Sequence, residues 1–86
     1  MKLRGNFITH EVDGEQIMVD TGGSNFVGLV RNNSTAAFIV DNLKTDTTKK
    51  RIVDAMCEKY NAPCEIIEAD VEEILENLRS IEALDE

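Results

Sequence analysis

Hydrophobic and polar residues alternate over residues 7–12 and again over residues 15–20, and the pair Asp13-Gly14 separates the two segments. Asp-Gly between alternating segments is typical of a two-residue β-hairpin loop, because its type I′ turn needs positive φ at both positions. This loop fixes the register and places one mostly apolar face on Ile8, His10, Val12, Ile17 and Val19. The opposite, mixed face carries Phe7, Thr9, Glu11, Gln16, Met18 and Asp20. We expect the apolar face to be core and the mixed face to meet water.

A third strand is predicted from Phe26 to Val30 or Arg31, after a turn that contains a Gly-Gly pair. Beyond this strand the spacing of apolar residues changes from two to three or four, as in a helix. Asn33 or Ser34 is expected to cap this first helix, because a short polar side chain there accepts a bond from a free backbone N–H. The apolar stripe of the helix is Ala36, Ile39, Val40 and Leu43.

A second helix is predicted after an interruption at residues 43–48, with Thr47 or Thr48 as its cap. It ends before Pro63, because the residue that precedes a proline disfavours the helical region. The apolar stripe of this helix is Ile52, Val53, Met56, Cys57 and Tyr60.

A third helix is predicted near the end of the chain, after a linking segment at residues 64–68. Asp70 is expected to begin it, since Asp70 and Glu73 have the spacing of a capping box. Its apolar stripe is Val71, Ile74, Leu75, Leu78 and Ile81. We expect residues 82–86 to fray.

The order of elements is therefore three strands followed by three helices, an α+β fold. Three strands alone bury little, so the helices must pack on one face of the sheet. The 86 residues are enough for one domain with one small core. The three helices are also compatible with a helix-turn-helix unit.

The first 53 residues and the remaining residues differ in net charge. The net charge is −8, yet residues 1–53 carry seven Lys or Arg against six Asp or Glu, and residues 54–86 carry two against eleven. A helix that reads DNA should be rich in Arg, Lys, Asn or Gln, whereas the third helix is acidic and repels phosphate. A winged-helix DNA-binding protein is therefore the weaker alternative, and we expect no nucleic-acid partner.

Residues that could support catalysis are sparse. His10 is the single histidine, and Cys57 and Cys64 have neither zinc nor C-x-x-C spacing. We interpret the cysteines as inert thiols, with a disulfide as the less favoured alternative in a reducing compartment. No apolar run approaches the roughly 18 residues that span a membrane. We expect a cytoplasmic protein that is not an enzyme and uses no metal, cofactor or membrane.

Three short motifs, in order, resemble those of the PqqD family, named for pyrroloquinoline quinone synthesis protein D. The segment 33–39 resembles that family's Asn-x-Thr-Ala-x-x-Ile, and Thr48 followed by Ile52 is similar to its Thr-x-x-x-Ile. Residues 68–78 resemble the Asp-Val and following Leu positions of its third helix. The resemblance covers about residues 5–84, although Asn32 stands where the family often has Leu.

The resemblance implies a three-stranded antiparallel sheet followed by a winged helix-turn-helix-like unit, as one peptide-binding domain over residues 1–86. Such proteins are peptide chaperones, also called RiPP recognition elements. They bind the leader of a ribosomally synthesised precursor peptide and present it for post-translational modification, often to a radical S-adenosylmethionine (SAM) maturase. In the family the leader adds as a strand to the third strand and lies against the third helix.

The residues supply a mechanism that fits this function. An exposed strand edge has unpaired backbone groups with which an extended peptide can pair. The expected edge consists of Val27, Gly28, Leu29, Val30 and Arg31. Gly28, without a side chain, would let the peptide backbone come close. The expected floor of the groove is Val71, Leu75 and Leu78.

The sequence leaves open both the role of the groove residues and the partner of the strand edge. Val71 and Leu75 fit the plain core as well as a groove, and for Leu78 the core is the favoured reading. The same strand edge would also allow a homodimer, or a generic interaction with an unrelated protein.

Overall fold

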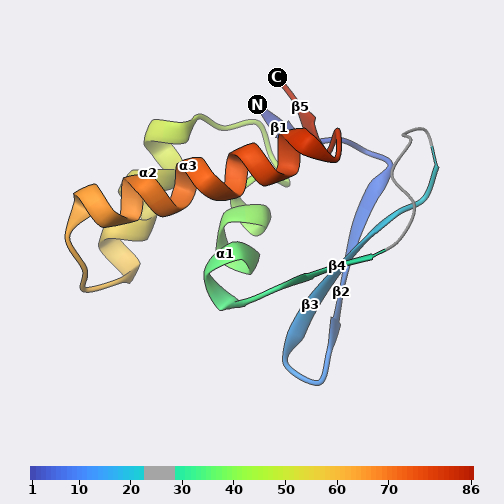
Figure 1. Cartoon of the computed structure of the whole chain (residues 1–86), viewed down its shortest axis with the longest axis horizontal. Helices are drawn as coiled ribbons and strands as arrows, with labels where there is room; N and C mark the ends of the chain where they lie inside the picture. The colour runs from blue at the N-terminus through green and yellow to red at the C-terminus, as the bar shows by residue number, and fades with distance from the viewer. Residues whose placement is uncertain (23–28) are drawn as a thin grey trace.

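The computed structural model describes residues 1–22 and 29–86. The strands are β1 (Lys2–Leu3), β2 (Phe7–Val12), β3 (Glu15–Asp20), β4 (Leu29–Asn32) and β5 (Leu84–Asp85). The helices are α1 (Ser34–Asn42), α2 (Lys49–Lys59) and α3 (Cys64–Ser80). Strands β2, β3 and β4 form an antiparallel sheet in that order (Figure 1). The predicted α+β class, a three-stranded sheet followed by three helices, is confirmed.

The hairpin β2–β3 has the predicted turn and register. Asp13 and Gly14 have φ values of 53° and 80°, as a type I′ turn requires. Val12 pairs with Glu15, so the register follows from the loop. The predicted start of the third strand, from Phe26 to Gly28, lies outside the described residues.

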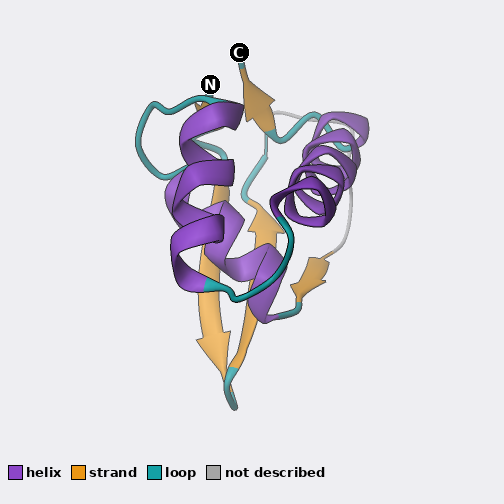
Figure 2. Cartoon of the chain, turned by 90° about the vertical axis from the view of Figure 1, so that its left-hand side faces the viewer, coloured by secondary structure: helices purple, strands orange, loops and turns teal. Residues whose placement is uncertain are grey.

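The prediction of which sheet face is buried is wrong. Met18 is 0% exposed and Phe7 is 4% exposed, whereas Ile8 is 40% and Val12 48% exposed. Alternation of apolar and polar residues separates the two faces of the sheet, but it does not reveal which face the helices after β4 cover. Met18 and Phe7 belong to the same buried cluster as the core residues of the three helices, and the helices lie in front of the sheet in Figure 2. The Ile8 face therefore points outward.

The first two helices begin where local capping predicts. The Asn33 side chain accepts a hydrogen bond from the Ala36 backbone N–H at 2.8 Å. The Thr48 hydroxyl accepts one from the Arg51 N–H at 3.2 Å. These short-range bonds satisfy N–H groups that have no partner inside the helix.

Helix α3 begins at Cys64, so the predicted linking segment at residues 64–68 and the start at Asp70 are wrong. The carbonyl of Pro63 accepts bonds from the N–H groups of Ile66 and Ile67. Ile67 is 3% exposed. Its position continues the buried stripe of α3 by one turn toward the N-terminus, because residues four apart share a helix face. Burial of Ile67 thus supports the additional helical turn.

The C-terminal segment is ordered, which corrects the expectation that it frays. Strand β5 pairs antiparallel with β1, and the Arg4 N–H donates to the Ala83 carbonyl at 2.8 Å. Ala83 and Leu84 are buried in the core. Figure 1 shows the two termini lying together as a result. This pairing joins the two ends of the chain, so the tail sequence alone does not reveal it.

The hydrophobic core lies between the three helices and the Met18 face of the sheet. Helix α2 packs against α3, and α1 contacts β3, β4 and α3. The largest fully buried side chains are Met18, Ile39, Val40, Leu43, Ile52, Met56, Val71 and Leu75. This core holds β4 and α3 at fixed positions on either side of α1.

Candidate functional site

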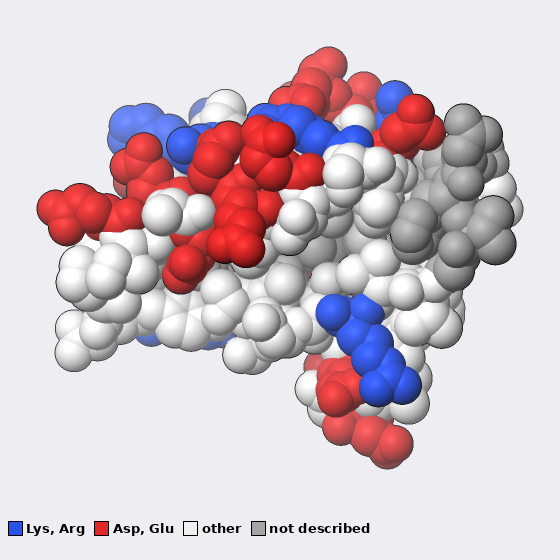
Figure 3. Space-filling view, viewed as in Figure 1, with Lys and Arg blue, Asp and Glu red and all other residues white. Residues whose placement is uncertain are grey.

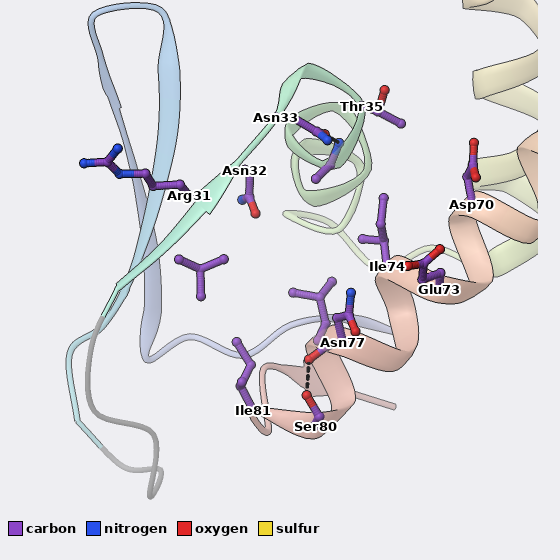
Figure 4. A pocket seen from close by; sticks show the side chains of 13 residues that line it. Arg31, Asn32, Asn33, Thr35, Asp70, Glu73, Ile74, Asn77, Ser80 and Ile81 are labelled. Atoms are coloured by element: carbon purple, nitrogen blue, oxygen red, sulfur yellow. Dashed lines mark hydrogen bonds between the residues drawn. The ribbon is translucent and has the colours of Figure 1, made fainter.

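A groove of about 570 Å³ lies between β4, the first turn of α1 and the C-terminal half of α3 (Figure 4). The sheet and α1 contribute Val30, Arg31, Asn32, Asn33, Thr35 and Ala36. Helix α3 contributes Asp70, Glu73, Ile74, Asn77, Leu78, Ser80 and Ile81, the last just beyond its end. The volume falls within the usual range of ligand sites.

The α3 wall of the groove is one continuous helix face. Its residues recur at spacings of three and four, and such residues lie above one another on a helix. Along this face the side chains change from acidic at Asp70 and Glu73 to mostly apolar at Ile74, Leu78 and Ile81. The groove therefore has an acidic end and a more apolar end.

Strand β4 forms the opposite wall and is an edge strand. Among the described strands it pairs with β3 alone. Alternate residues of an edge strand direct their N–H and C=O groups away from the sheet, where an extended peptide can pair with them. Val30 shares the helix-side face with Met18, its partner in β3. The Arg31 side chain points away from α3 (Figure 4).

The junction between β4 and α1 is fixed by a chain of hydrogen bonds. Asn32 is buried and donates its Nδ2 to Gln16 Oε1 at 2.7 Å. Gln16 Nε2 in turn donates to Asp41 Oδ1 on α1 at 3.0 Å. A buried amide is stable only when it is hydrogen-bonded, so Gln16 allows an asparagine at a position that faces the core.

Carboxylates gather over α3 (Figure 3), and several of those that do not line the groove are paired with cations. Lys49 Nζ lies 2.8 Å from Glu72 Oε2, and Arg79 lies 3.0 Å from both Glu76 and Glu86. The hydrogen bond with Lys49 lowers the pKa of Glu72, and the same bond raises the pKa of Lys49. These pairs join α2, α3 and the C-terminal residue Glu86 on the surface.

The family model for coenzyme PQQ synthesis protein D (PqqD) matches residues 15–84. The chain belongs to the PqqD family. Two solved structures share its fold. The first, "TbiB1 in Complex with the TbiA(beta) Leader Peptide", is 21% identical with a TM-score of 0.84, and the match covers 99% of this chain and 95% of that one.

The second structure is "Lasso peptide synthetase B1 complexed with the leader peptide". It is 19% identical with a TM-score of 0.76, and the match covers 92% of this chain and 89% of that one. A comparison with curated proteins gave no match.

The peptide-site residues expected from sequence fall into four groups in this PqqD-family fold. Val27 and Gly28 lie outside the described residues. Val30, Arg31 and Leu78 line the groove, and Leu78, at 4% exposure, also belongs to the core, the reading that the sequence favoured for it. Leu29 is exposed on the outward face of β4. Val71 and Leu75 are fully buried in the core beneath α3. The role of these residues in peptide binding stays a prediction.

Sequence reasoning did not single out the first turn of α1 or the α3 residues Ile74, Asn77 and Ile81 as site residues. Ile74 and Ile81 were placed on the apolar stripe of α3, but nothing in that stripe separates groove from core. The signal was the polar Asn77, which is exposed and follows Glu73 at helical spacing. A face that mixes exposed polar and half-buried apolar residues is typical of a binding surface rather than of a core.

Other candidate chemistry is limited in the part of the chain that the structure covers. No group of three or more His, Cys, Asp or Glu is placed to hold a metal ion there. Cys57 and Cys64 are free thiols, and the hydrogen bond between them raises the pKa of Cys57 to about 11. Among the described helices, none combines the length and the apolar character needed to cross a bilayer.

Proposed function

We propose that the whole chain is one recognition module that binds the leader of a ribosomally synthesised precursor peptide. The leader adds as a strand to β4, and the chain presents it to a modifying enzyme without itself catalysing a reaction. The observation that carries this proposal is the open edge of β4, which faces a groove walled by α3. The two structures of the same fold, each a complex with a leader peptide, support it.

In strand addition, the backbone and the side chains contribute differently to binding. Hydrogen bonds to the β4 backbone give affinity for many sequences, and side-chain pockets select among them. Successive side chains of a strand point to opposite faces. One set of leader side chains therefore enters the groove toward Val30, Ile74 and Leu78, and the other set continues the outward face of the sheet beside Leu29.

The partner enzyme in this proposal is a maturase, of the radical SAM type that the family resemblance implies. A carrier that holds the leader also holds the core peptide near the enzyme, and such tethering raises its local concentration to about millimolar. A homodimer through the same β4 edge would compete with the leader. Leader binding should then convert any dimer into a monomeric complex, which sedimentation velocity would detect.

The test begins with the genes that neighbour this one, where a short peptide gene beside a maturase gene provides the leader. Calorimetric titration of that leader measures binding to the wild type, Ile74→Asp and Ile66→Asp. Ile74 lines the groove, whereas Ile66 is an exposed residue of the first turn of α3. We expect Ile74→Asp to weaken binding at least about tenfold, which is about 1.4 kcal/mol. Ile66→Asp should bind as the wild type does.

Circular dichroism establishes that both variants are folded before binding is compared. Equal affinity of the wild type and folded Ile74→Asp would refute the groove as the leader site. Titration of labelled duplex DNA at low salt tests the alternative function. Tight, salt-sensitive binding of DNA would contradict the peptide proposal, because phosphate contacts dominate such affinity.

A further inference from the structure

The carboxylates of α3 fall into two sets that differ in their partners. Glu68 and Glu72 lie 3.8 Å and 2.8 Å from Lys49 Nζ, and Glu76 lies 3.0 Å from Arg79. Asp70 and Glu73 belong to the groove instead. Within the described part of the chain, no hydrogen bond or ion pair is formed by either of their side chains.

The groove does not neutralise these two carboxylates. Among its described lining residues Arg31 is the one cation, and Figure 4 shows its side chain pointing away from α3. The nearest α3 neighbours in the lining are Ile74 and Asn77, neither of which carries charge. An occupant with a cation at this end would therefore supply the missing opposite charge.

The other end of the groove has different chemistry. Val30, Leu78 and Ile81 line it, and Figure 3 shows a largely uncharged band in the region between the acidic surface of α3 and β4. Apolar side chains of a bound peptide gain free energy from the area they remove from water there. A peptide that satisfies the whole groove thus needs an apolar residue at one end and a basic residue at the other.

We propose that the leader bound by this chain carries a Lys or Arg beside Asp70 and Glu73, and an apolar anchor between Val30, Leu78 and Ile81. This inference rests on the proposed function and specifies the class of peptide selected. The midpoint of Asp70 and Glu73 and the midpoint of Leu78 and Ile81 are about eight residues apart along α3, or about 12 Å at a helical rise of about 1.5 Å per residue. A strand advances about 3.3 Å per residue, so the basic residue and the anchor are about four positions apart.

A spacing of four also agrees with strand geometry. Positions that differ by an even number point to the same face of a strand, so both side chains enter the groove together. Because the pair is at the surface, the gain is moderate and is reduced by salt. We expect neutralisation of the peptide's basic residue to weaken binding about two- to fivefold at low salt.

The experiment selects peptides from a displayed library of random dodecapeptides. The targets are the wild type, Asp70→Lys/Glu73→Lys, and the matched control Glu58→Lys/Glu65→Lys, whose exposed carboxylates lie on α2 and at the start of α3. The wild type and the control should enrich Lys or Arg about four positions from an apolar residue. The groove variant should enrich Asp or Glu at that position, while Asp70→Asn/Glu73→Gln should lose the charge preference.

Two outcomes separate this inference from the proposed function. If selected peptides bind the groove, as judged by weakening in Ile74→Asp, but show no charge preference that the groove variants change, the inference is overturned and the function stands. If no selected peptide is weakened by Ile74→Asp, both are overturned. Thermal unfolding of each charge variant shows that the comparison is made between folded proteins.

Discussion

At the scale of single residues, two side chains decide how the sheet is placed on the helices. Met18 is fully buried between the sheet and the helices, and Asn32 is buried with its amide bonded to Gln16. Neither was expected from the sequence, because the face of Met18 reads as mixed and polar. A flexible methionine fills such a space well, and Gln16 removes the cost of burying the amide.

The burial of the Met18 face of the sheet, rather than the Ile8 face, leads to a prediction about stability. Met18→Ala should lower the free energy of unfolding by about 2–5 kcal/mol, because it removes a fully buried side chain and leaves a cavity. Ile8→Ala, on the outward face of the adjacent strand, is the matched control and should cost less than about 1 kcal/mol. Urea denaturation measures both. A larger loss in Ile8→Ala than in Met18→Ala would mean that the other face is buried.

The thiol pair predicts a pH dependence. The hydrogen bond with Cys64 is the main cause that raises the pKa of Cys57 from 9.0 to about 11. The pKa of this thiol is higher in the folded than in the unfolded state. Its contribution to folding stability is therefore complete below about pH 9 and is lost as the pH rises through about 11. Cys64→Ala removes this bond, so its unfolding free energy should fall less over this pH range. Ultraviolet titration of the Cys57 thiolate should then show a lower pKa, and an unchanged value would contradict the bond.

At the scale of elements, local chemistry was readable and distant packing was not. The Asp13-Gly14 turn and the caps Asn33 and Thr48 depend on bonds between residues at most three apart, so the sequence predicts them correctly. The start of α3 depends on Ile67 packing into a core made by other elements. The capping-box spacing at Asp70 was misleading, since a helix that has already begun does not need a cap.

The longer α3 is tested by two adjacent isoleucines. Ile67 is buried in the core, and Ile66 is 56% exposed on the same helical turn. Ile67→Ala should therefore lower the free energy of unfolding by about 2–5 kcal/mol, and Ile66→Ala by less than about 1 kcal/mol. Thermal or urea unfolding gives the comparison. Similar small losses in both variants would indicate that residues 64–68 are the linking segment that the sequence first indicates.

At the scale of the whole molecule, the ends of the chain and the charge distribution set which surface is free. Pairing of β5 with β1 brings the two termini together, far from the β2–β3 turn (Figure 1). No local sequence pattern predicts this contact between the two ends. The family resemblance implied that the leader lies between the third strand and the third helix. The groove lies between β4 and α3, and its role in leader binding stays a prediction. The family motifs could not separate Val71 and Leu75, which are core, from Ile74 and Ile81, which line the groove, because all four share one apolar stripe.

Strand addition has a consequence for hydrogen exchange that distinguishes it from other ways of filling the groove. An edge strand has some amides bonded to its neighbour and others that face away and exchange rapidly. In β4 the second set faces the groove, so a leader that pairs with it should slow exchange of alternate amides among residues 29–32. Amides of α2, which packs behind α3, should change far less than those of β4.

Exchange followed by NMR, with and without saturating leader, resolves these amides individually. A peptide bound as a helix or through side chains alone would protect α3 contacts without the alternating pattern in β4. That result would leave leader binding intact and refute its geometry. If alternating protection in β4 disappears in folded Ile74→Asp, then β4 and α3 belong to one binding site. Loss of the side-chain pocket on α3 would in that case also release the backbone pairing with β4.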